Sequence, residues 1–143
     1  MPIYEMHNTN SLKGHAQQAI QLFDQIADQL RQHVIFSDQE DSVAITLWIR
    51  GNYLVDHWDI WPTLYIFSPE RECGKTTLLT VIEAFVKKGK LAGSITPSAL
   101  YGIIEASQPT ICIDEANRLL NQNDDLNCII NSGYTRRTLF IIT

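Results

Sequence analysis

The stretch that decides the expected fold is LYIFSPERECGKTTLLTVIEAFV, residues 64–86. Its first four residues are apolar or aromatic and lie between Pro62 and Pro69, which is typical of a short buried strand. Its last part, from Leu78 onward, is apolar at most positions and predicts a helix that is buried over much of its surface. A strand, a turn and a buried helix are therefore expected in succession.

The turn carries residue types that are typical of a phosphate-binding loop. Such a loop presents backbone N–H groups at a helix N-terminus, a Lys for the β- and γ-phosphates of a nucleotide, and a hydroxyl group for Mg²⁺. The usual pattern is GxxxxGK[ST], but Pro69 stands in place of its first glycine, and the N–H groups nearest the β-phosphate come later in the loop. The predicted nucleotide-binding residues are Glu70, Arg71, Glu72, Cys73, Gly74, Lys75, Thr76 and Thr77.

A second motif supports the first, since a GKT triplet alone also occurs by chance or as a simple helix cap. TICIDE, residues 110–115, is an apolar strand that ends in two carboxylates. Successive side chains of a strand point in opposite directions, so we expect different roles for the two. Asp114 and Thr76 are predicted to hold Mg²⁺, and Glu115 to act with Lys75 in catalysis, as the base that orients the attacking water. The alternative is that both carboxylates are solvated residues at a strand end.

Hydrophobic periodicity predicts the rest of the organisation. We expect a loose leader over residues 1–12, a helical segment over 13–62 with helices at 15–32 and about 38–51, and a nucleotide-binding core over 63–143. The second of these helices should bury Val43, Ala44, Leu47 and Trp48. Within the core, the expected elements are strands at 91–95, 110–113 and 138–142 and helices from Pro97 and over 124–131. This alternation predicts a three-layer α/β fold, in which helices cover both faces of a parallel sheet.

Composition excludes several classes of protein. Of the 143 residues, 45% are hydrophobic and 19% charged, as in ordinary globular domains. A net charge of −5 argues against a surface that coats DNA. No apolar stretch is long enough for a membrane span or signal peptide, which predicts a cytoplasmic protein. The three cysteines have neither the number nor the spacing of a disulfide framework or a zinc site.

Three longer segments carry a family resemblance: LWIRGNYLVDHWDIWPTLYIFSPERECGKTTLL, ITPSALYGIIEASQPTICIDEAN and IINSGYTRR. Together they resemble a family of bacterial and phage P-loop ATPase domains of uncharacterised function, often attached to or encoded near primase-like replication proteins of mobile elements. The resemblance covers about residues 43–137 and includes Pro69 in the loop. These domains are similar to the additional-strand ATPases, which include AAA+ proteins and hexameric helicases. The resemblance implies a P-loop NTPase fold, hydrolysis of Mg-ATP and assembly into a ring.

The chain departs from that class at its C-terminus. Members carry a polar sensor residue on a further strand, and an arginine from a helical lid reaches the γ-phosphate of a neighbouring subunit. Because the sequence stops at Thr143, we expect an incomplete core without sensor strand and lid, as in a truncated relative, completed by a homo-oligomer or a partner replication protein. Arg136 and Arg137 are candidates for such a finger or for contact with DNA phosphate, or they form a basic turn at a helix end.

The expected function is Mg-ATP binding with ATP hydrolysis in the DNA replication of a phage or mobile element. One alternative is a non-catalytic nucleotide-binding or interaction module. Another is a P-loop small-molecule kinase, although kinases usually have an arginine-rich lid and lack the carboxylate pair. Trp58 and Trp61 are candidates for stacking on adenine, or they seal the helical layer.

Overall fold

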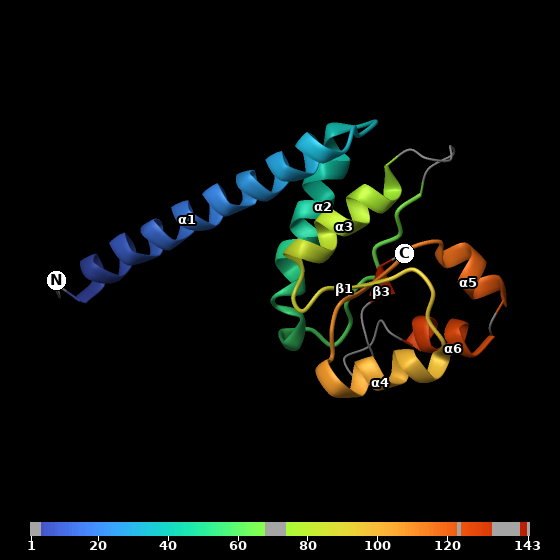
Figure 1. Cartoon of the computed structure of the whole chain (residues 1–143). Helices are drawn as coiled ribbons and strands as arrows, with labels where there is room; N and C mark the ends of the chain where they lie inside the picture. The colour runs from blue at the N-terminus through green and yellow to red at the C-terminus, as the bar shows by residue number, and fades with distance from the viewer. Residues whose placement is uncertain (1–3, 68–73, 123, 133–140, 143) are drawn as a thin grey trace.

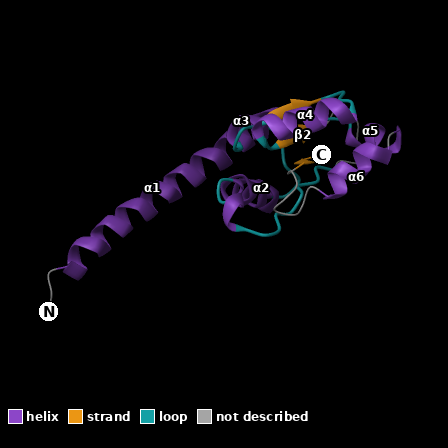
Figure 2. Cartoon of the chain, turned by 90° about the horizontal axis from the view of Figure 1, so that it is seen from below, coloured by secondary structure: helices purple, strands orange, loops and turns teal. Residues whose placement is uncertain are grey.

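A computed structural model describes residues 4–67, 74–122, 124–132 and 141–142. The helices are α1 (Tyr4–His33), α2 (Gln39–Asn52), α3 (Lys75–Phe85), α4 (Pro97–Ser107), α5 (Ala116–Gln122) and α6 (Asp124–Ser132), with a 3₁₀ turn η1 (Val55–His57). The strands are β1 (Lys90–Ala92), β2 (Ile111–Ile113) and β3 (Ile141–Ile142). They form one parallel sheet in the order β1-β2-β3. Figure 1 labels β1 and β3, and Figure 2 labels β2.

The predicted three-layer P-loop NTPase fold is wrong for this chain. Helix accounts for 66% of the described residues. The sheet is correspondingly small, because each strand within the described ranges has only two or three residues. Most of the core is therefore formed by helix faces, and the parallel pairing is the part of the expectation that holds.

The segment at 64–67 accounts for part of the difference. It was predicted to be a buried strand, but it lies outside the strands of the described residues. Leu64 and Ile66 pack against the core, whereas Tyr65 and Phe67 are 63% and 86% exposed. The side chains alternate as they would in a strand, and only one face is covered. A fully buried strand needs cover on both faces and a neighbour for its N–H and C=O groups.

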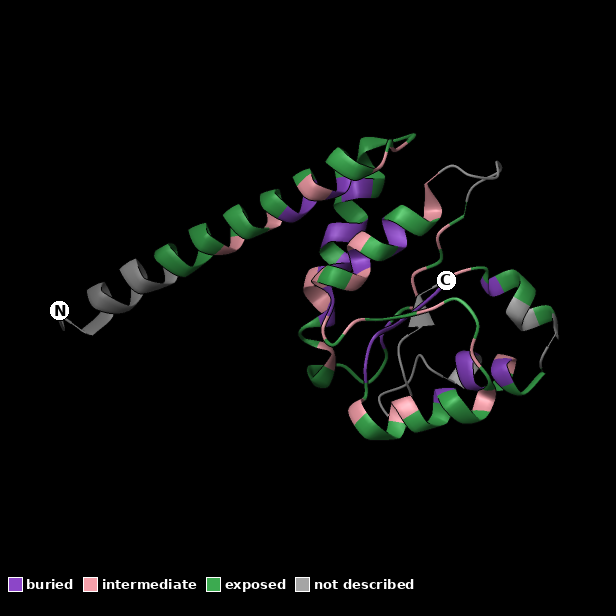
Figure 3. Cartoon of the chain, in the orientation of Figure 1, coloured by how far each residue is buried: buried purple, intermediate pink, exposed green. Residues whose placement is uncertain are grey.

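Helix α1 is longer than predicted and only partly buried. It begins at Tyr4, so residues 4–12, expected as a leader, are helical. Figures 1 and 2 show its N-terminal half extending away from the rest of the molecule. Over residues 13–33, where burial is described, the buried residues lie near the C-terminal end, as the colours of Figure 3 show: Ile26, Ala27 and Leu30 are buried, while Ile20 is 54% exposed. A regular apolar periodicity thus predicts the helix correctly but not how much of it is covered.

Helix α2 has the predicted bounds but a different buried face. Of the two expected cap residues, Ser37 and Asp38, the N-cap is Asp38, although its side chain makes no capping hydrogen bond. Of the four residues expected to be buried, only Trp48 is; Val43, Ala44 and Leu47 are exposed. The buried residues instead include three polar ones, Ser42, Thr46 and Asn52, beside Ile45 and Ile49. A count of apolar residues misses this face, because polar residues can be buried when their hydroxyl groups bond within the helix. Thr46 Oγ1, for example, donates to the carbonyl of Ser42 at 2.7 Å.

Asn52 links three parts of the chain in the interior. Its side-chain Nδ2 donates to Thr110 Oγ1 at 3.0 Å, just before β2. Its Oδ1 accepts from the backbone N–H of Lys87 at 2.8 Å, in the turn after α3. Asn52 and Thr110 are both buried. One side-chain amide thereby connects the end of α2, the end of α3 and the start of β2.

Two hydrophobic clusters meet at β2. Cys112 belongs to the cluster formed with α1, α2 and α3, whereas Ile111 and Ile113 belong to the cluster formed with α4 and α6. Neighbouring residues of a strand point to opposite faces, so the short strand serves both clusters. Its C-terminal end, where Asp114 follows, is thereby placed firmly beside α3.

Candidate functional site

The site begins at the N-terminus of α3. Gly74 is the N-cap residue and has φ 84° and ψ 11°, a left-handed conformation that glycine adopts without steric cost. The first helical bond of α3 runs from Leu78 N to Gly74 O at 2.9 Å. The N–H groups of the first turn of a helix lack intrahelical acceptors, and the helix dipole is positive there. This end of α3 therefore suits an anion.

One hydrogen bond joins the two sequence motifs. Thr76 Oγ1, on the first turn of α3, donates to Asp114 Oδ2 at 2.8 Å, although 38 positions separate the two residues. Asp114 directly follows β2, and its N–H donates to the carbonyl of Ala92 at the end of β1 at 3.0 Å. Asp114 is half-buried and Thr76 is exposed. The two residues predicted to hold Mg²⁺ thus lie in direct contact, with an open side toward solvent.

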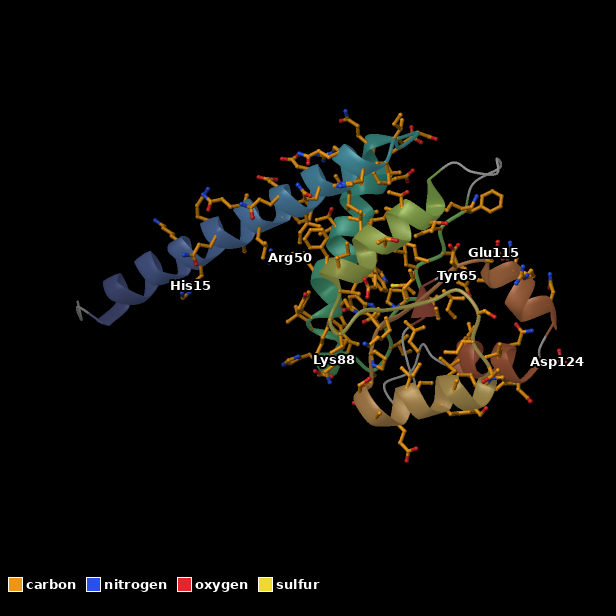
Figure 4. The ribbon with its side chains drawn as sticks, viewed as in Figure 1. His15, Arg50, Tyr65, Lys88, Glu115 and Asp124 are labelled. Carbon is orange, nitrogen blue, oxygen red and sulfur yellow. The ribbon has the colours of Figure 1, made fainter. Side chains whose placement is uncertain are left out.

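Glu115 follows Asp114 in the chain and lies directly before α5 (Figure 4), but its carboxylate has a different partner. Its φ is 53°, so the chain turns sharply between β2 and α5. Its backbone N–H donates to Asp114 Oδ1 at 2.9 Å, which orients the Asp114 carboxylate from the other side. Its own carboxylate Oε2 lies 3.2 Å from Arg118 Nη1, and both side chains are 62% exposed. Sequence reasoning missed Arg118, whose only signal was its position three residues after the carboxylate pair on a helix, α5, that was not predicted.

The remaining predicted site residues divide into two groups. Lys75, at the first position of α3, is half-buried, and Thr77 is exposed beside Thr76. Both belong to the same helical turn as Thr76. The other residues lie outside the described ones: Glu70, Arg71, Glu72 and Cys73 of the loop, and Arg136 and Arg137 near the C-terminus.

The described residues do not form a ready-made metal cage. Across residues 4–67, 74–122, 124–132 and 141–142 there is no group of three or more His, Cys, Asp or Glu side chains that could hold a metal ion. A magnesium ion at Thr76 and Asp114 would need further oxygen ligands from water and phosphate, which is how Mg²⁺ usually binds beside nucleotides.

The tryptophans serve the core. Trp61 is buried, with its ring centroid 6.1 Å from that of Trp48 and 6.4 Å from that of Trp58. Trp48 Nε1 donates to the carbonyl of Pro62 at 2.8 Å. Trp61 therefore seals the helical layer, and only Trp58, which is 54% exposed, has a ring partly open to solvent.

The chain was compared with protein-family models, with curated proteins and with solved structures, and no match was found in any of the three. Among the helices of the described residues, none combines the length and the apolar character needed to cross a bilayer.

Proposed function

We propose that the chain binds Mg-ATP at the N-terminus of α3 and hydrolyses it. The observation that carries the proposal is the Thr76–Asp114 hydrogen bond, which brings together a helix-start hydroxyl and a strand-end carboxylate from two distant motifs. A hydroxyl and a carboxylate are the hard oxygen groups that Mg²⁺ prefers. The left-handed Gly74 beside them permits close approach of the backbone to a phosphate.

Each residue of the site has a role in the proposal. Lys75 would pair with the β- and γ-phosphates, and Thr76 and Asp114 would hold the magnesium ion, which would supply positive charge beside the phosphate oxygens. Glu115 accepts the proton of a water molecule whose oxygen attacks the γ-phosphorus. The bond from that phosphorus to the β–γ bridging oxygen breaks, which yields ADP and inorganic phosphate.

The biological setting rests on the family resemblance alone. From this resemblance we propose a cytoplasmic protein that acts in the DNA replication of a phage or mobile element, as a homo-oligomer or with a partner replication protein. DNA contact through Arg136 and Arg137 belongs to the same proposal.

Metal-dependent binding is tested by calorimetric titration with ATP, in the presence of Mg²⁺ and of a chelator. Thr76→Ser keeps the hydroxyl and should bind like the wild type, whereas Thr76→Ala should weaken Mg-ATP binding about tenfold or more. In Asp114→Asn, the new amide N–H₂ can donate to Thr76 Oγ1 while the amide oxygen accepts from Glu115 N–H. This variant should therefore keep its melting temperature and lose the magnesium dependence. Unchanged Mg-ATP affinity in both Thr76→Ala and Asp114→Asn would contradict the proposal.

Hydrolysis is tested separately through phosphate release. Glu115→Gln should retain ATP affinity and lose turnover, and Lys75→Ala should lose both. Binding without turnover in the wild type would instead favour the non-catalytic module. One observation already favours that second candidate: the Glu115 carboxylate is paired with Arg118 rather than directed at Thr76.

A further inference from the structure

A cleft of about 510 Å³ lies between α1 and α3. Gln29 and His33 line it from α1, and Thr76, Thr77, Val81 and Phe85 are among the residues that line it from α3. Figure 1 shows α3 alongside the C-terminal part of α1, the part of that helix that is buried. We call this cavity the α1–α3 cleft. Its volume falls within the range of small-molecule sites, about 300–1,000 Å³.

The cleft is continuous with the candidate phosphate site because Thr76 belongs to both. Thr76 lines the cleft and donates its hydroxyl to Asp114. Thr77 and Val81 continue along α3 from that point. A nucleotide whose phosphates lie at the start of α3 therefore has an open cleft beside it, with room for a ribose and a base.

The lining suits an amino-bearing base. Val81 and Phe85 offer apolar surface for the faces of a planar ring. His33 Nδ1 lies 2.8 Å from the carbonyl oxygen of Gln29. A carbonyl only accepts hydrogen bonds, so in the neutral ring the hydrogen is on Nδ1, and Nε2 carries a lone pair. That lone pair can accept a hydrogen bond from an exocyclic amino group such as that of adenine.

We propose that the α1–α3 cleft binds the nucleoside of the nucleotide, with adenine as the base and His33 as its recognition residue. The inference rests on the proposed binding of Mg-ATP and adds the base class and the role of α1. Thr77 is exposed, lines the cleft and follows Thr76 directly, so the proposal assigns it to the ribose.

The test compares Mg-ATP with Mg-tripolyphosphate, which has the phosphates without the nucleoside. The wild type should bind Mg-ATP at least about tenfold more tightly than Mg-tripolyphosphate, and more tightly than Mg-UTP, which lacks both the second ring and the amino group. His33→Ala should weaken Mg-ATP binding about tenfold and leave Mg-tripolyphosphate binding unchanged. His15→Ala, an exposed histidine on the same helix and away from the cleft, is the matched control and should change neither. Ala84→Phe, which fills the cleft from α3, should act like His33→Ala.

The outcomes separate this inference from the proposed function. Equal affinity of the wild type for Mg-ATP and Mg-tripolyphosphate would overturn the cleft assignment and leave the phosphate site intact. Equal weakening of both ligands by His33→Ala would also overturn it. Binding of neither ligand by the wild type would remove both proposals. Photolabelling with 8-azido-ATP gives an independent readout: attachment to the peptides around residues 29–33 and 80–85 is expected, and attachment confined to other peptides contradicts the assignment.

Discussion

Gly74 shows how a single backbone conformation prepares the start of α3. Its φ of 84° lies in the left-handed region, and a Cβ atom built on it would meet no heavy atom within 4 Å. The position therefore requires glycine for its backbone angle and not for lack of space. This separates conformational strain from steric clash, two effects that a glycine substitution usually combines.

We expect Gly74→Ala to lower the free energy of unfolding by about 1–2 kcal/mol, the cost of a left-handed conformation for a residue with a Cβ. Gly93→Ala is the matched control, because Gly93 also has no heavy atom within 4 Å of an added Cβ but lacks a left-handed φ. Denaturant unfolding measures both. Equal effects in the two variants would show that the left-handed angle is not what constrains Gly74.

Among the buried polar residues, Asn52 makes the clearest contribution to the stability of the fold. We expect Asn52→Ala to lower the free energy of unfolding by roughly 2–4 kcal/mol, because Thr110 Oγ1 and Lys87 N–H lose a partner in the interior. Asn117→Ala, at an exposed position, should change it by less than about 0.5 kcal/mol. A small loss at Asn52 would mean that water replaces the amide and that the link is not structural.

Helix α1 combines two halves with different roles. Its C-terminal half packs on α2 and α3 and is held there by polar bonds as well, such as that from Arg50 Nη1 to the carbonyl of Ala19 at 2.8 Å. Its N-terminal half extends from the molecule. A helix contributes to stability chiefly through the face that it buries, so the buried and exposed positions of α1 should respond differently to the same substitution.

The pair Ile26→Ala and Ile20→Ala tests this difference on one helix with one chemical change. Ile26 is 5% exposed and Ile20 54%. We expect a loss of about 2–4 kcal/mol at Ile26 from burial and cavity terms, and less than about 1 kcal/mol at Ile20. Chemical denaturation measures both. A comparable loss at Ile20 would show that the surface of α1 around this residue is covered in solution.

The molecule as a whole is organised around β2, and its central residue, Cys112, reports on the packing of the cluster formed with α1, α2 and α3. Burial, with a smaller contribution from the Glu83 carboxylate, raises the pKa of the Cys112 thiol to about 12. The thiolate is the reactive form, so Cys112 should resist thiol reagents in the folded protein, while the exposed Cys128 reacts.

Mass spectrometry after brief alkylation should find Cys128 modified and Cys112 modified only after unfolding. The raised pKa also sets a direction for stability, because the unfolded chain releases the thiol proton first as the pH rises. The contribution of the Cys112 thiol to the free energy of unfolding should therefore be fully present below its ordinary pKa of 9.0. It should be lost progressively as the pH rises toward the raised pKa of about 12. In Cys112→Ala, the part of the loss of stability at alkaline pH that comes from this thiol should be absent. Rapid labelling of Cys112 in the native state would contradict the packing of β2.

Local signals determined several elements from sequence alone. The cap at Asp38, the Pro97 start of α4 and the apolar run of β2 all appear at or near their predicted positions. The start of α4 shows such local chemistry directly, because the Thr96 side chain accepts a hydrogen bond from Ala99 N–H. The contact between Thr76 and Asp114 was also predictable as a hypothesis. The phosphate-loop motif specifies the hydroxyl residue, and the strand-end motif specifies the carboxylate.

Only the tertiary structure decided which of these elements are covered and what the site residues touch. The run at 64–67 has the composition of a buried strand, yet Tyr65 and Phe67 face solvent. Helix α2 turns a face containing Ser42 and Thr46 inward, and the Glu115 carboxylate pairs with Arg118. Local sequence sets backbone preference through nearby sterics and hydrogen bonds, whereas burial and side-chain pairing depend on segments far apart in the chain, which meet only once it has folded.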